Sequence, residues 1–294
     1  MNITAMYFSG TGTTKKVTAA IADELTESKI SQDKTAAGEN PGSIKAGIKP
    51  WQRAEDIDFT PPAARREIYR FTPDDLVVFG VPVIAGRVPN VLLKFLDTLQ
   101  GGGALAVPVV LYGNRNFDDA LIELRNILQD RGFYAIGAAS FSRILAAGRP
   151  DSSDMELSRD FARKLAGKIR RLGAAGLREA APVPVDGADP IRPYYKPQDR
   201  NGNHINILKV KPKLHAELCS GCGICVSACP MGSVVQENPG QPPAPITGIC
   251  IKCCGCVKEC PRQAFYFDDP GFIYHKEELE DMYAGIRREP DLYL

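Results

Sequence analysis

No cysteine occurs in the first 218 residues of this 294-residue chain, and all nine cysteines lie between Cys219 and Cys260. Chains that rely on disulfides usually spread their cysteines over distant loops, so this clustering favours metal ligation in a reducing compartment. The N-terminal residues also lack the basic segment and cleavage pattern of a signal peptide. The sequence therefore predicts a cytoplasmic protein with one metal-binding segment.

An excess of charge of either sign is also missing, because 36 Lys and Arg residues balance 35 Asp and Glu residues. Nucleic-acid-binding proteins usually carry a clear basic excess, so we expect no nucleic acid as a partner. The longest nearly apolar runs, 76–86 and 104–113, are shorter than the ~20 residues of a membrane span. No Ser-His-Asp, paired-carboxylate or nicotinamide-binding pattern is present, so we predict no catalytic residue.

Apolar runs alternate with helix patterns over the first ~175 residues, which predicts a five-stranded parallel sheet with helices on both faces, an α/β fold. The expected strands are 2–8, 56–60, 76–80, 107–112 and 133–141. The last helix is expected to begin with a capping box formed by Ser153 and Glu156.

Composition divides the chain further, and we expect domain 1–175 to contain a surface insertion at 29–55. Prolines are frequent in 176–205, which predicts an extended linker. The cysteine-rich segment fills 206–269 and is expected to form a small α+β domain. An acidic C-terminal tail, 270–294, completes the division.

The cysteines form two copies of the spacing C-x2-C-x2-C-x3-C-P, which is typical of bacterial ferredoxins with two 4Fe-4S clusters. In such a run three thiolates wrap one cluster, and the fourth reaches the other cluster. The first cluster is then assigned to Cys219, Cys222, Cys225 and Cys260, and the second to Cys250, Cys253, Cys256 and Cys229. The ninth cysteine, Cys254, is expected to point away from its cluster.

Structural zinc is the alternative, but zinc sites usually pair two C-x2-C knuckles around one ion. Two identical runs that each end in proline favour iron–sulfur clusters instead. Over about 60 residues, with every ligand matched, the segment resembles the two-cluster 4Fe-4S ferredoxin family.

Hydroxyl residues and glycines follow the first strand and open a helix, as suits a phosphate at a helix N-terminus. These residues are Ser9, Gly10, Thr11, Gly12, Thr13 and Thr14. A turn that only caps the helix is an equal alternative. Two further loops follow the third and fourth strands, at the carboxyl ends of the strands, where open α/β sheets bind ligands.

Together the three loops resemble those of flavodoxin, which implies a flavodoxin-like sheet and an FMN cofactor. By that resemblance Ser9, Thr11, Thr13, Thr14 and the loop amides bind the FMN phosphate. The residues that border the flavin ring are then Pro82, Val83, Ile84, Ala85, Gly86 and Arg87, with Gly113, Asn114, Arg115, Asn116, Phe117 and Asp118. Phe117 either stacks on the ring or packs in the core, and Arg87 either pairs with the flavin or an acidic partner or is a solvated loop charge.

Nearly the whole chain outside 29–55 resembles the EFR-type flavodoxin–ferredoxin fusions, through the 7–12, 80–89, 112–121 and 146–151 segments. The resemblance implies an electron-transfer protein that passes electrons between two 4Fe-4S clusters, FMN and a redox partner protein. The alternative is an FMN-dependent oxidoreductase that reduces a small redox acceptor such as a quinone.

Overall fold

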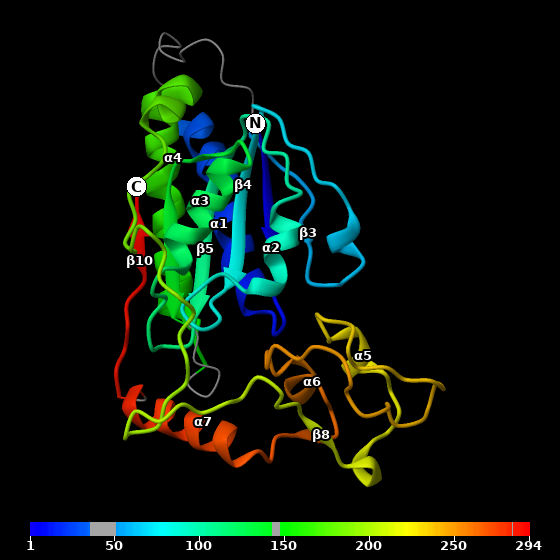
Figure 1. Cartoon of the computed structure of the whole chain (residues 1–294). Coiled ribbons are helices and arrows are strands. Elements are labelled where there is room, and N and C mark those ends of the chain that lie inside the picture. Colours follow the sequence, from blue (N-terminus) through cyan, green and yellow to red (C-terminus); the bar gives the residue numbers. More distant parts are fainter. Residues whose placement is uncertain (36–50, 143–147, 284) are drawn as a thin grey trace.

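The computed structural model describes residues 1–35, 51–142, 148–283 and 285–294, which form a sheet-based body and a smaller body beside one end of the sheet (Figure 1). The sheet strands are β1 (Asn2–Tyr7), β2 (Gln52–Arg53), β3 (Ile57–Asp58), β4 (Asp75–Pro82), β5 (Leu105–Tyr112), β6 (Tyr134–Ala135), β7 (Ala138–Ser142) and β10 (Asp291–Tyr293). Their order is β10-β7-β5-β4-β1-β2, and all neighbours are parallel except β10 and β7. The parallel part has the flavodoxin-like order 2-1-3-4-5, as predicted.

Helices cover both faces of the sheet because strand side chains alternate between two cores. Ile3 and Ala5 of β1 belong to the core under α1 (Thr13–Thr35) and α4 (Ser152–Ala180). Met6 and Phe8 point to the opposite core, under α2 (Asn90–Leu96) and α3 (Ala120–Asp130). The sheet is therefore buried on both faces, and the candidate loops lie at the carboxyl ends of its strands.

The second predicted strand, 56–60, is present as the short β3, and part of the expected insertion 29–55 is regular structure. Trp51, which is only 8% exposed, packs in the core and places Gln52–Arg53 beside β1 as β2, ahead of β3. At the other end of the insertion α1 continues to Thr35. The remaining residues, 36–50, lie outside the described part of the chain.

The capping box of α4 was predicted two residues too far along the chain. Asp151 is the N-cap, its side chain accepts the Asp154 amide proton at 3.0 Å, and the Asp154 carboxylate accepts the Asp151 amide proton at 3.0 Å. Asp154 is buried and also binds Arg149, so the buried ion pair selects this register over Ser153 and Glu156.

The smaller body has an antiparallel pair, β8 (Lys213–Leu214) and β9 (Phe265–Tyr266), and two one-turn helices, α5 (Ile224–Ser227) and α6 (Gly255–Lys258). The 3-10 turn η3 (Ala216–Leu218) also belongs to this body, whereas the 3-10 turn η2 (Ala64–Arg66) follows β3 in the sheet-based body. The buried core of the smaller body is small and contains Cys225, Val234 and Phe265. This is the α+β arrangement expected for the cysteine-rich segment.

Residues 270–294 form structure rather than the expected tail. After α7 (Pro270–Tyr283) the chain returns to the sheet, where β10 pairs antiparallel with β7 and places Asp291 opposite Ser140. The Ser140 hydroxyl donates to the Asp291 carboxylate at 2.8 Å, and the Tyr293 hydroxyl donates to Asp186 at 2.9 Å. The smaller body is therefore held between two segments that both belong to the sheet-based body (Figure 1). None of the helices in the described ranges is long and apolar enough to cross a membrane.

Candidate functional site

The two cysteine runs fold as related halves. Each places a left-handed residue before its short helix, Gly223 (φ 74°) before α5 and Cys254 (φ 60°) before α6. After the fourth cysteine of each run, the amide four residues later donates to the thiol. The Ser233 amide lies 3.3 Å from Cys229 Sγ, and the Ala264 amide lies 3.3 Å from Cys260 Sγ. The repeated spacing thus produces repeated geometry.

The structure brings the predicted ligands together in two quartets. In the first, burial raises the pKa of Cys225, and the neighbouring thiols of Cys219, Cys222 and Cys260 raise it further. In the second, burial raises the pKa of Cys253 to about 11 and that of Cys256 to about 12, and both thiols are close to Cys250 and Cys229. Each group of four contains three cysteines of one run and the fourth cysteine of the other.

All four cysteines of the second quartet line one small cavity of about 20 Å³. Cys254 borders this cavity too, instead of pointing away from it, and its Sγ lies 3.5 Å from the Lys252 carbonyl oxygen. Across the described ranges, no three Cys, His, Asp or Glu side chains meet closely enough to hold a single metal ion. Four thiols that converge on one small cavity, with the Ser233 amide donating to Cys229 Sγ, are the donor set that an anionic iron–sulfur cluster uses.

The loop between β1 and α1 has the features of an anion cradle. Gly12 has φ 78°, and an added Cβ there would meet nothing within 4 Å, while Thr11 and Thr14 are buried. The first amides of α1 have no intrahelical acceptor. Ser9 Oγ accepts one of them, the Lys15 amide, at 3.1 Å. Ser9 therefore caps the helix, as the capping alternative expected, and the amides of Thr13 and Thr14 lie in the same first turn, where a helix favours an anion.

The two expected ring loops contact each other. Ile84 and Arg87 close a tight turn through reciprocal backbone hydrogen bonds of 3.0 and 3.2 Å. Gly86 sits at φ 77°, and a Cβ there would lie 2.2 Å from Asp118 Oδ2, so only glycine fits. The Asp119 amide donates to the Gly86 carbonyl at 3.1 Å.

Three of the predicted ring-loop residues are engaged within the protein. Phe117 is 7% exposed and packs on Tyr112 in the core, which is the core alternative. Arg87 pairs with Glu123 at 2.6 Å instead of being a solvated loop charge. The buried Asn114 donates from its side chain to the carbonyls of Tyr283 and Ile286 at 2.8 and 3.0 Å, which ties this loop to the end of α7.

Residues 186–195, here called the strap, cross these loops although the segment was expected to be a linker. Arg192 binds Asp119 through paired hydrogen bonds of 2.6 and 2.9 Å, and these bonds hold the pKa of Asp119 far below its usual range. The Tyr195 amide donates to the Ala85 carbonyl at 2.8 Å, and the Arg115 guanidinium lies 4.3 Å from the Tyr195 ring centroid. The residues that hold the strap lie in two short sequence stretches, the Asp-Asp pair at 118–119 and the Arg-Pro-Tyr-Tyr stretch at 192–195. Because these stretches are far apart along the chain, no local pattern indicates that they meet.

His275 of α7 packs against the strap, although no sequence pattern predicts a role for it. Its ring stacks on Tyr195 at 6.1 Å between centroids, and burial lowers its pKa. The Nδ1 atom is buried and has no hydrogen-bond partner among the described residues. The charged groups around it are Glu278 and Arg115.

The second quartet lies against the loop of residues 9–14, the candidate phosphate loop. A Cβ on Gly10 would be 3.1 Å from Cys253 Cβ, and a Cβ on Gly255 would be 2.7 Å from the Gly10 carbonyl oxygen. The Lys258 ammonium donates to the Thr11 carbonyl at 2.8 Å, and Arg65 donates to the Pro230 carbonyl at 2.5 Å. Only close backbone approach, which the two glycines permit, allows this contact.

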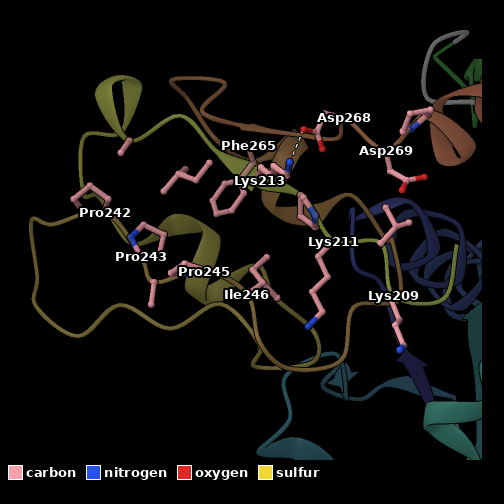
Figure 2. Close-up of a pocket in the computed structure, with 16 residues that line it drawn as sticks. Lys209, Lys211, Lys213, Pro242, Pro243, Pro245, Ile246, Phe265, Asp268 and Asp269 are labelled. Carbon is pink, nitrogen blue, oxygen red and sulfur yellow. Dashed lines mark hydrogen bonds and ion pairs between the residues drawn. The ribbon is translucent and has the colours of Figure 1, made fainter.

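A separate groove of about 790 Å³ lies between β8 and residues 242–246 (Figure 2). Lys209, Lys211 and Lys213 stand along one side, and Figure 2 shows Lys213 directed at Asp268, with which it pairs at 2.6 Å. The candidate ligands do not line this groove. It is therefore distinct from both quartets.

Known proteins are similar to two parts of the chain. Residues 218–265 match the family model of the 4Fe-4S dicluster domain. Similar solved structures include a flavodoxin from the domain Archaea (16% identity, 58% of this chain, 99% of that chain, TM-score 0.39) and Flavodoxin 1 from Bacillus cereus (17%, 57%, 98%, 0.37). The apo form of an NADH:FMN oxidoreductase is also similar (16%, 58%, 88%, 0.36). No curated protein sequence matches.

The strand order is flavodoxin-like, and residues 218–265 match a domain whose model carries 4Fe-4S clusters, so the architecture is compatible with a redox function. A flavodoxin-like body and a smaller body that matches the 4Fe-4S dicluster domain together fit a flavodoxin–ferredoxin fusion.

Proposed function

We propose that this chain is an electron carrier in which two 4Fe-4S clusters exchange single electrons with one FMN and with an external redox partner. The observation that carries the proposal is the contact between Cys253 of the second quartet and Gly10 of the phosphate loop. A cluster and a flavin held on either side of that contact would be neighbours. Iron–sulfur clusters supply one-electron chemistry and the flavin connects it to two-electron chemistry.

The two quartets are proposed as the ligands of the two clusters, four thiolates to each. The grouping of Cys219, Cys222, Cys225 and Cys260, and of Cys250, Cys253, Cys256 and Cys229, supports this assignment. The amides that donate to Cys229 and Cys260 would offset part of the negative charge of cluster and thiolates.

For FMN, the amides and hydroxyls of 9–14 are proposed to bind the phosphate, at the switch point where the 2-1-3-4-5 strand order reverses. The ring is proposed to lie along the turn of Ile84, Ala85 and Gly86 and along Gly113 and Arg115. Arg87, Asn114 and Phe117 support these loops from behind, because their polar groups or rings are engaged elsewhere.

The enzyme alternative, reduction of a small acceptor such as a quinone, needs an open approach to the flavin ring. The strap and α7 lie over both ring loops through Tyr195 and the Asn114 contacts. This cover supports the carrier.

We also retain the division into a flavodoxin-like domain 1–175 and a ferredoxin-type domain 206–269, with β10 added to the first.

The test begins with anaerobic purification and measurement of iron and flavin per chain. After rapid photoreduction of the clusters, the flavin should be reduced at a rate that does not depend on protein concentration. A rate that scales with concentration would mean transfer between molecules and would overturn the proposal. Thr11→Asp should abolish FMN binding by repelling the phosphate, while Thr98→Asp, at an exposed position two residues beyond α2, should retain it.

A further inference from the structure

The two related halves of the ferredoxin-type body differ at one structurally equivalent position. Gly255 is the first residue of α6, and Ile224 is the first residue of α5. Gly255 is buried against Gly10, whereas Ile224 is 40% exposed. The same structural element is therefore covered by a redox domain in one half and presented to solvent in the other.

The contacts with the flavodoxin-like body described above come from the second quartet's side, through Pro230, Cys253, Gly255 and Lys258. The loop of the first quartet packs within its own body. Gln236 donates to the Gly221 carbonyl at 2.9 Å, and Gly221 lies against Gly240. The first quartet is thus the outer one, and the second is the inner one.

The outer quartet has an accessible thiol with apolar neighbours. Cys222 is exposed, whereas the other seven candidate ligands are buried or half-buried. Leu218, which is 43% exposed, and Ile224 flank it along the chain. We call Leu218, Cys222 and Ile224 the outer face. Glu217, beside it, is paired with His215 at 3.0 Å.

We propose that the outer face is the docking surface for a protein that carries single electrons. Electrons would then pass in one order, from the partner to the outer quartet, from there to the inner quartet, and on to the flavin. This inference rests on the proposed function. The inner half shows how such an element docks, because its equivalent surface is covered by a redox domain of this same chain. The exposed apolar side chains beside the accessible thiol would be buried on docking and would form the apolar centre that a protein interface requires.

The electron count selects a one-electron partner. With the cofactors bound, a reduced carrier would give up one electron to a cluster held by the outer quartet, and the inner quartet's cluster would pass it to the flavin. Two such electrons and two protons from solvent would complete the reduction of the flavin. A nicotinamide delivers two electrons as a hydride, which a cluster does not accept.

The experiment uses the full chain loaded with iron, sulfide and FMN, and a reduced bacterial-type 4Fe-4S ferredoxin as donor. Ile224→Lys should slow cluster reduction by that protein at least about tenfold, because it places a charge in the centre of the interface. Reduction by dithionite and transfer from clusters to flavin should be unchanged. Equal reduction rates with the ferredoxin donor would overturn the docking surface.

The matched variant at the equivalent inner position is Gly255→Ile, which should give the opposite pattern. Cluster reduction by the donor should be unchanged, while cluster-to-flavin transfer should slow at least about tenfold because the two bodies no longer meet. Hydrogen exchange of the 9–14 amides should speed up by a similar factor, even in chain without cofactors. Should Gly255→Ile lose iron, Lys258→Ala tests the same contact. If hydrogen exchange and cluster-to-flavin transfer were both unchanged in these variants, the proposed order of electron transfer would be overturned. If the unaltered chain showed no cluster-to-flavin transfer, the proposed function itself would be overturned.

Discussion

Cys254 occupies the position that Gly223 has in the first cysteine run, and both have a left-handed backbone. Such a conformation costs an L-residue about 1–2 kcal/mol, and glycine avoids that cost. We expect Cys254→Gly to retain all iron and to raise the free energy of unfolding by about 1 kcal/mol, measured by chemical denaturation under anaerobic conditions.

A β-branched residue provides the contrast at the same position. Cys254→Val should lower the free energy of unfolding, since branching at Cβ makes a positive φ more costly. Cys253→Ser, one residue earlier, should lose iron. If Cys254→Gly lost a cluster while Cys253→Ser kept both, the assignment of the inner quartet would be wrong.

His275 predicts a dependence of stability on pH near neutrality. Burial lowers its pKa below the ordinary value of 6.5, so the unfolded chain binds a proton that the folded chain excludes. The neutral ring therefore contributes fully above about pH 6.5, and the contribution is lost as the pH falls below that value. Between pH 7 and 5.5 the loss should reach up to about 1 kcal/mol.

His275→Phe, which can still stack on Tyr195, should remove this part of the acid sensitivity. His204→Gln, at an exposed histidine, should leave it intact. The measurement is the urea midpoint at the two pH values. Asp119 acts at lower pH, because its depressed pKa means that its contribution is lost only as the pH falls below about 4. Unaltered acid sensitivity in His275→Phe would contradict the role of this residue.

Among the elements, β10 offers the clearest test, because it was absent from the sequence-based expectation. Deletion of residues 290–294 removes the only antiparallel neighbour of β7 described above, together with the Ser140–Asp291 hydrogen bond. We expect a loss of about 1–3 kcal/mol in the free energy of unfolding. Hydrogen exchange of β7 should accelerate, while Leu294→Ala, at an exposed side chain, should change neither quantity.

The elements that the sequence predicted have strong local signals. β4 and β5 are continuous apolar runs, and the cysteine spacing specifies its own loop geometry. β10 has three half-buried residues and no such run. The strap is held by Arg192 and Asp119, which are 73 residues apart, so its position depends on a polar contact that no local pattern encodes.

The same distinction explains the flavin loops. Their positions at strand ends followed from the alternation of strands and helices, but the partners of Arg87, Asn114 and Phe117 did not. Arg87 in particular looks like a surface charge in sequence, and it becomes a half-buried link only when α3 brings the buried Glu123 beside it.

For the whole molecule, the two connections of the ferredoxin-type body have a measurable consequence. An engineered protease site in the exposed turn at 199–203 would cut one connection and leave α7 and β10 attached. We expect the two fragments to elute together from a sizing column at micromolar concentration. The same cut combined with deletion of 290–294 should release them, and release after the single cut would show that β10 contributes no anchorage.

The return of the chain to its first sheet also has a consequence for biosynthesis. β10 leaves the ribosome about 150 residues after β7, which takes roughly ten to thirty seconds at ordinary rates of translation. During that interval the edge of β7 is unpaired, and an unpaired strand edge invites aggregation. Since the cysteine runs emerge within the same interval, prompt delivery of iron and sulfide to the nascent chain would shorten the exposure of that edge, and iron starvation would prolong it.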